Sequence, residues 1–222
     1  MEHPDKSRIT HTDALSHVIA MGRSHVTPVQ QPDDTTCGPT ALKHALSMFG
    51  KRKSLANLME LCGTNRNGTS TKNMIRAANK LGFSVLIVEY ATLHHLQSAL
   101  KYNPNQLRAV LVSYLYDLDE KDRPHAESGH WAAVSAYSAS KSRIVLFDSS
   151  SAQKKSYDWA DFRLRWMDYD LKRRNIGKRK KHFMLIRKWQ QQLLFVMARD
   201  PAHLPRFTID TSHVFRPGQT IS

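Results

Sequence analysis

Cys37 is the residue of this sequence best placed to do chemistry, because it lies where a turn-rich loop meets a predicted helix. It stands in the segment Thr-Thr-Cys-Gly-Pro-Thr, residues 35–40. Pro39 suits the first turn of a helix, where its missing N–H group is not needed. A thiol at a helix N-terminus faces unpaired N–H groups and the positive end of the helix dipole, which can lower its pKa from ~8.5 to ~3.5–7.5. The sequence therefore predicts that Cys37 is a thiolate nucleophile.

Three further residues can complete a site around this thiol. Gln31 lies six positions before Cys37, and its side-chain amide can return to the nucleophile as one oxyanion donor beside the Cys37 backbone N–H. His130 begins one predicted strand and Asp148 ends the next. Because a tight turn joins these strands, their outer ends should lie side by side. Asp148 would then orient the ring of His130 while its other nitrogen takes the thiol proton.

The other residues with metal-binding or nucleophilic side chains have no comparable set of candidate partners in the sequence. Cys62 ends a second predicted helix, and a free cysteine is usually a small buried hydrophobic residue. His94 and His95 are adjacent on a predicted helix and point about 100° apart, so they are poorly placed to share one metal. His44 lies two turns beyond the thiol, too far to act on it. There is no HExxH motif and no paired CxxC motif, so we expect no metal and no cofactor.

The first half of the chain is predicted to be helical. Apolar residues recur every three or four positions over residues 38–49, and Gly50 follows as a stop. A second helix is expected over residues 54–61 with Ser54 as its cap. A third is expected over residues 70–81, capped by Thr69 or Ser70 and ended by Gly82.

The second half is richer in strand signals. β-branched and aromatic residues cluster in segments bounded by turn-forming residues, and helical patterns separate some of them. The predicted strands are 83–90, 108–116, 130–138, 143–148 and 182–188, and the further helices are 91–102 and 157–171. Helices first and strands afterwards indicate an α+β fold, with helices packed on an antiparallel sheet.

The charge of the protein is strongly positive and unevenly distributed. Lys and Arg number 33 against 19 Asp and Glu, which gives a net charge of +14. Residues 172–182 read KRRNIGKRKKH and hold seven Lys or Arg and no acid. We expect this basic run to be a solvated loop, with a dock for an anionic partner as the alternative. The nearby aromatic residues have helical spacing and no RNA-binding motif is present, which argues against nucleic acid.

The length of 222 residues suits one domain with terminal additions. We expect a polar N-terminal arm over residues 1–25, a catalytic domain over residues 26–189 and a C-terminal extension over residues 190–222. No apolar run reaches the ~18–20 residues of a membrane span, and the first thirty residues hold no secretory signal. A cytoplasmic location with free thiols is therefore expected.

The motifs Q-x5-C-G-P-T-A-L, G-H-W-A-A-V and I-V-L-F-D-S together resemble papain-like cysteine peptidases, and within them the bacteriocin-leader (double-glycine) peptidase family. The resemblance covers residues 26–188. It implies a papain-like fold whose helical half carries the nucleophile. It also implies Cys37 as nucleophile, His130 as general base, Asp148 as orienting acid and Gln31 as oxyanion donor.

The resemblance further places Gly68 and Thr69 beside the cleft, with Trp131 next to the catalytic histidine as a candidate substrate contact. Family members that mature bacteriocins are fused to a transporter and an ATPase, and this sequence has neither a span nor a P-loop. We therefore expect a cysteine peptidase that acts on a peptide or protein substrate. A deamidase or amidase using the same residues stays open, as does a retired site in a protein that binds through its basic run.

Overall fold

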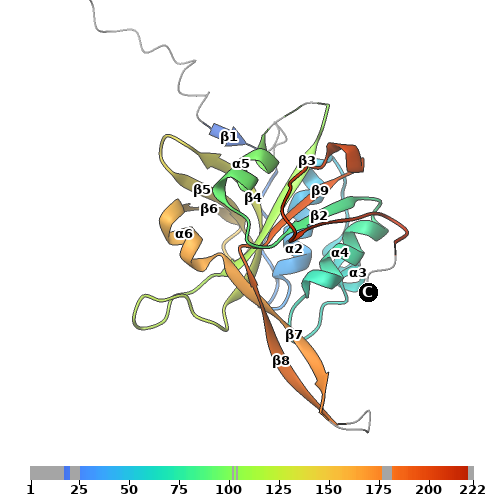
Figure 1. The fold of residues 1–222 in the computed structure, drawn as a ribbon, viewed down its shortest axis with the longest axis vertical. Coiled ribbons are helices and arrows are strands. Elements are labelled where there is room, and N and C mark those ends of the chain that lie inside the picture. Colours follow the sequence, from blue (N-terminus) through green and yellow to red (C-terminus); the bar gives the residue numbers. More distant parts are fainter. Residues whose placement is uncertain (1–17, 21–25, 102, 104, 177–181, 220–222) are drawn as a thin grey trace, which may run out of the picture.

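The computed structural model describes residues 18–20, 26–101, 103, 105–176 and 182–219 (Figure 1). Most of the expected N-terminal arm, residues 1–17 and 21–25, lies outside the described residues. So do residues 177–181 of the basic run.

The three helices expected in the first half are present within two residues of their predicted ends. They are α2 (Cys37–Met48), α3 (Leu55–Cys62) and α4 (Thr71–Lys80). Ser54 and Ser70 cap α3 and α4, because each hydroxyl accepts a hydrogen bond from a backbone N–H of the first turn. The remaining helical segments are α5 (Leu93–Leu100), α6 (Trp159–Arg165) and the short 3-10 helix η1 (Pro201–His203).

Among the described residues, an eight-stranded antiparallel sheet forms the centre of the fold. The strand order is β10-β2-β9-β3-β4-β5-β6, and β1 pairs with the far end of β4. The strands are β1 (Val18–Ala20), β2 (Ser84–Val88), β3 (Arg108–Leu115), β4 (Gly129–Ser138), β5 (Arg143–Asp148), β6 (Gln153–Asp158), β9 (Leu194–Ala198) and β10 (Ser212–Phe215).

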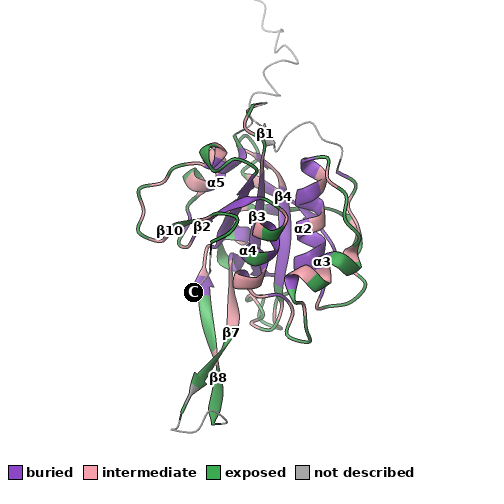
Figure 2. Cartoon of the chain, turned by 90° about the vertical axis from the view of Figure 1, so that its right-hand side faces the viewer, coloured by how far each residue is buried: buried purple, intermediate pink, exposed green. Residues whose placement is uncertain are grey.

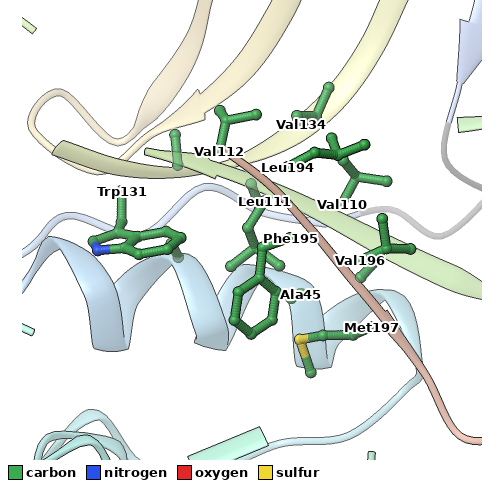
Figure 3. Close-up of a cluster of buried hydrophobic side chains, with 14 of the residues drawn as sticks. Ala45, Val110, Leu111, Val112, Trp131, Val134, Leu194, Phe195, Val196 and Met197 are labelled. Carbon is green, nitrogen blue, oxygen red and sulfur yellow. The ribbon is translucent and has the colours of Figure 1, made fainter. Parts of the chain in front are cut away.

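The two faces of this sheet pack against different elements. Trp131, Leu111 and Phe195 point toward α2, and Leu111 and Phe195 lie beside Ala45 (Figure 3). Alternate residues point to the opposite face, where Tyr114 contacts the ring of Phe162 from α6, with 5.6 Å between ring centroids. The expected α+β fold, with the helix that begins at Cys37 packed on an antiparallel sheet, is confirmed.

The segment expected to be a C-terminal extension contributes a central strand. β9 pairs with β2 on one side and β3 on the other, and all five of its residues are buried. The sheet thus runs across the boundary expected at residue 189, and it includes β9 and β10, up to Phe215. The sequence Leu-Phe-Val-Met-Ala is a continuous apolar run, which is typical of a strand covered on both faces.

The prediction for residues 157–182 was wrong in two respects. The helix is short, Trp159–Arg165, and the chain then forms the hairpin of β7 (Met167–Asn175) and β8 (Phe183–Gln191). Residues 172–175 of the basic run are therefore strand and not loop. The helical spacing of the aromatic residues predicted too long a helix. Phe162 on α6 and Trp166 directly after it are both buried, but Tyr169 already belongs to β7.

The β7–β8 hairpin projects away from the body of the molecule (Figure 1). Most of its length is exposed, in contrast to the buried sheet above it (Figure 2). No helix in the part of the chain that the structure describes is both long and apolar enough to cross a membrane.

Candidate active site

The thiol of Cys37 lies at the first turn of α2, where the start of this helix packs closely against the loop before α4. Cys37 begins the helix and is 5% exposed. A Cβ atom on Gly38 would lie 2.8 Å from Cβ of Thr69, so only glycine lets the start of α2 pack against the loop before α4. Thr69 in turn accepts a hydrogen bond from the indole N–H of Trp131 on β4, at 3.1 Å.

The surroundings of this thiol favour its protonated form. The pKa of Cys37 is raised to about 11, chiefly by burial and also by the charge of the Asp168 carboxylate. The backbone N–H groups of Trp131, Gly38 and Cys37 itself act in the opposite direction. The helix start therefore lowers the pKa as the sequence predicted, but burial outweighs it, and the expected low pKa is wrong for this arrangement.

His130 and Asp148 lie side by side, as the predicted strand pairing requires. Nε2 of His130 is 3.9 Å from Oδ1 of Asp148, and both side chains are buried. Asp148 accepts hydrogen bonds from the hydroxyls of Tyr116 and Ser151 and from the backbone N–H of Ser150. Burial lowers the pKa of His130 to about 4, which outweighs the attraction of Asp148. The imidazole is therefore neutral at pH 7 and has a nitrogen able to accept a proton.

Gln31 joins this pair through Ser149, a residue that the sequence analysis did not single out. The Ser149 hydroxyl donates to Oε1 of Gln31 at 2.6 Å and lies 3.3 Å from Nε2 of His130. The backbone N–H of Gln31 also donates to the Ser149 carbonyl at 2.8 Å. The side-chain N–H of Gln31 donates to the backbone carbonyl of Asp33. The sequence offered one signal for Ser149, because this serine directly follows Asp148 at the end of a predicted strand.

This bonding pattern selects one tautomer of His130. The single proton of the Ser149 hydroxyl is donated to Gln31, so the hydroxyl oxygen can only accept at its contact with the ring. Nε2 must then carry the proton, and it also faces Asp148. Nδ1 keeps its lone pair, which makes it the ring atom able to act as a base.

The predicted site residues form two neighbouring groups. A pocket of about 470 Å³ is lined by Cys37, Gly68, Thr69 and Trp131, while His130, Asp148 and Gln31 gather around Ser149. All of these residues belong to the part of the chain that the structure describes. Within that part, the Cys37 sulfur and the His130 ring form no hydrogen bond with each other.

The two groups meet at adjacent residues of β4. Trp131 is paired with Ser113 of β3, and His130 is paired with Tyr114. Successive strand residues point to opposite faces, so the indole lies on the α2 side. The His130 ring contacts Tyr114 and Tyr116, with centroid separations of 5.7 and 5.0 Å.

Asp168 is a second residue of the thiol pocket that the sequence analysis missed. It lies on β7 and accepts hydrogen bonds from the Ser113 hydroxyl, at 2.5 Å, and from the backbone N–H of Tyr169. A Cβ atom on Gly129 would collide with its carboxylate, so the glycine before His130 makes room for it. Burial raises the pKa of Asp168 to about 6. Its carboxylate is therefore charged at pH 7 and opposes ionisation of the neighbouring thiol.

A family model described as "Peptidase C39 family" matches residues 25–175, which is more than half of the chain. The chain belongs to the peptidase C39 family. This confirms the resemblance drawn from the motifs around Cys37, His130 and Asp148, and it confirms the expected cysteine-peptidase type at the level of the family.

Curated relatives of this C39 peptidase match over a short stretch. The lactococcin-A transport/processing ATP-binding protein LcnC of Lactococcus lactis is 46% identical over 55 residues. The mesentericin-Y105 transport/processing ATP-binding protein MesD of Leuconostoc mesenteroides is 34% identical over 61 residues. These stretches cover 25% and 28% of this chain but only 8% of either relative.

Solved structures extend the likeness of the C39 fold over most of the chain. The peptidase domain of Streptococcus ComA, a bifunctional ABC transporter, is 19% identical with a TM-score of 0.53 and covers 79% of this chain and all of its own. A putative C39-like peptidase from Bacillus anthracis is 12% identical with a TM-score of 0.53. It covers 81% of this chain and 96% of its own. The papain-like architecture expected from the sequence is confirmed by these neighbours.

Proposed function

We propose that this C39 family member is a cysteine peptidase in which Cys37 attacks the carbonyl carbon of a peptide bond. The observation that carries the proposal is the match to the peptidase C39 family across the segment that holds Gln31, Cys37, His130 and Asp148. The opening of the thiol pocket at the start of α2 and the contact of His130 with Asp148 support it.

Each residue has a chemical role in this proposal. Nδ1 of His130 takes the thiol proton as the carbon–sulfur bond forms, and the resulting imidazolium gives that proton to the leaving amine. Asp148 and Ser149 hold the ring by its Nε2–H. The backbone N–H of Cys37 and the amide of Gln31 stabilise the negative charge on the carbonyl oxygen. Water, deprotonated by the same histidine, then cleaves the thioester and releases the acid product.

The proposal requires a rearrangement at residues 129–131. In the described arrangement Asp168 occupies the side of the thiol next to Gly129, and the His130 ring lies on the other face of β4. Rotation of the β4 end would bring Nδ1 toward the sulfur. The Gln31 amide would also leave its bond to the Asp33 carbonyl to reach the oxyanion.

We propose an extended peptide with small residues at the cleaved bond as the substrate. The small residues Gly68, Thr69 and Gly129 line the thiol pocket beside Cys37 and Trp131. A related solved structure, 13% identical with a TM-score of 0.50, is described as a double glycine motif protease in complex with the leader peptide.

The test is hydrolysis of fluorogenic peptides that end in Gly-Gly before the reporter group. Cys37→Ala should abolish turnover, and His130→Ala should lower kcat by ~10²–10⁴-fold. Cys62→Ala is the matched control, because this second buried thiol lies outside the pocket. Turnover that survives Cys37→Ala would refute the proposal.

The same assay separates the alternatives. A deamidase would release ammonia from glutamine-containing peptides without producing peptide fragments, which mass spectrometry distinguishes. The raised pKa of Cys37 and the absence of a bond to His130 are the observations that favour a retired site. That alternative predicts no turnover by the unaltered protein while its binding activity persists.

A further inference from the structure

The far half of the β7–β8 hairpin combines apolar and basic side chains in a way that the peptidase site does not use. We define the hairpin tip as the described residues 172–176 and 182–186. Four of its apolar side chains are strongly exposed: Ile176 63%, Leu185 54%, Met184 46% and Phe183 40%. Monomeric domains seldom leave such clusters in water unless they bind something.

The apolar side chains lie on both faces of the hairpin tip. Cross-strand partners share a face, and Leu185 is paired with Arg173 while Met184 is paired with Arg174. Because residues 184 and 185 are successive in β8, their side chains point in opposite directions. A folded partner that packs on one face would leave the other apolar face in water. A medium that surrounds the tip covers both.

The charges of the hairpin tip are all of one sign. Lys172, Arg173 and Arg174 are exposed, and the tip as described contains no acidic residue. The guanidinium of Arg173 lies 4.5 Å from the ring centroid of Phe183, so cation and apolar surface are presented together. Exposed apolar side chains among basic ones are the composition of segments that enter the boundary of an anionic bilayer.

The root of the hairpin fixes the direction in which the tip points. Asp170 accepts a hydrogen bond from the backbone N–H of Thr71, and Gln190 accepts one from the Thr71 hydroxyl. Glu127 accepts from Tyr169 and pairs with Arg187. These bonds tie the root to the body, and the tip extends beyond every other described element (Figures 1 and 2). The tip can thus reach a flat surface that the body does not touch.

We propose that the hairpin tip binds the surface of an anionic lipid bilayer. Ile176, Phe183, Met184 and Leu185 would enter the headgroup and upper acyl region, and Lys172, Arg173 and Arg174 would contact lipid phosphates. At that depth, water and lipid headgroups can form hydrogen bonds with the unpaired backbone N–H and C=O groups at the edges of the two strands. The tip therefore does not have to cross the membrane. Double-stranded nucleic acid would satisfy the charges but leave the apolar side chains of both faces unmatched.

Vesicle sedimentation with the full chain tests this proposal. The protein should bind vesicles of phosphatidylcholine with ~30% phosphatidylserine at least about tenfold more tightly than pure phosphatidylcholine vesicles, and ~0.5 M NaCl should remove most of the difference. Phe183→Ser with Leu185→Ser should weaken binding at least about fivefold. Leu164→Ser is the matched control, because Leu164 is even more exposed (61%) but lies on α6, and it should change nothing.

A fluorescent reporter locates the contact independently of affinity. In a Cys37→Ser background, an environment-sensitive dye on Leu185→Cys should shift to shorter wavelength with the anionic vesicles, and the same dye on Leu164→Cys should not. The buried Cys62 should stay unlabelled. Equal binding to both vesicle types, binding unaffected by the double substitution, or retention of a DNA duplex in place of vesicles would overturn the proposal. Peptidase turnover is not the readout, so this outcome is independent of the proposed function.

Discussion

The carboxylate of Asp168 lies beside the thiol of Cys37, and its charge helps to keep that thiol protonated. Asp168→Asn preserves the shape of the side chain and its hydrogen bond with Ser113 but removes the charge. We expect the pKa of Cys37 to fall, and a fall of one unit makes alkylation by iodoacetamide about tenfold faster below the pKa. The measurement is the pH dependence of the alkylation rate between pH 7 and 10.

Asp170→Asn is the matched control for that experiment. Asp170 lies two residues along β7 and also lines the pocket, but it bonds to Thr71 and is not among the main causes of the raised pKa of Cys37. Equal acceleration by both variants would contradict a specific effect of Asp168. Cys62, whose pKa burial raises to about 12, should react more slowly than Cys37 in every variant.

Ser149 should act as a positioning residue for the proposed catalytic histidine. Ser149→Ala removes the hydroxyl that bonds Gln31 and contacts Nε2 of His130. We expect kcat on a fluorogenic Gly-Gly peptide to fall by about tenfold with KM little changed, because the hydroxyl orients a base and does not line the pocket. The ring should also lose its tautomer preference, visible in the ¹⁵N shifts of His130. Ser150→Ala, one residue away and exposed, should change neither quantity.

Two buried histidines should make the protein less stable as the pH falls. Burial lowers the pKa of both His130 and His44 from 6.5 to about 4. Between these values the unfolded chain binds more protons than the folded one, so the free energy of unfolding decreases as the pH falls from 6.5 toward 4. Nε2 of His44 accepts a hydrogen bond from the backbone N–H of Val29 at 2.8 Å, and protonation would break it.

Asp168 has the opposite linkage. Its folded pKa is raised from 3.8 to about 6, so the folded state takes up its proton first and is stabilised as the pH falls through 6 toward 3.8. Urea unfolding at pH 7, 5.5 and 4.5 should therefore show a net loss of stability that becomes steeper in Asp168→Asn. A stability that rises toward pH 4.5 would mean that neither histidine is buried in its neutral form.

The centre and the edge of the sheet should differ sharply in their sensitivity to truncation of a side chain. Phe195→Ala on β9 should lower the free energy of unfolding by about 3–5 kcal/mol, because the ring is fully buried against Trp131. Val214→Ala on the edge strand β10, where the side chain is 44% exposed, should cost no more than about 0.5 kcal/mol. Chemical denaturation of both variants at pH 7 measures this difference, and equal losses would show that β9 is not central.

Local patterns were sufficient to predict four of the helices and five of the ten strands among the described residues. Serine caps predicted the starts of α3 and α4, and Gly82 the end of α4, within one or two residues, and the turn between β4 and β5 brought His130 to Asp148. Strand order is a long-range property, so the position of β9 between β2 and β3 has no local signal. The same reason hid Asp168, which reaches Cys37 only because the hairpin root packs on Ser113.

The protonation of the thiol was mispredicted for a different reason. A helix N-terminus can be recognised from the residues around Cys37, but the desolvation of that thiol depends on what the folded chain places over it. Burial at 5% exposure follows from tertiary packing, and it reverses the direction that the local electrostatics favour.

The central position of β9 also bears on how the protein is made. During translation, every residue of the proposed catalytic set leaves the ribosome before Leu194, so a nascent chain carries its nucleophile while β2 and β3 still lack the strand that lies between them. Completion of the sheet thus waits for β9 and β10, which follow every residue of the proposed catalytic set along the chain. The order of synthesis therefore places the nucleophile in a chain whose central sheet is still incomplete.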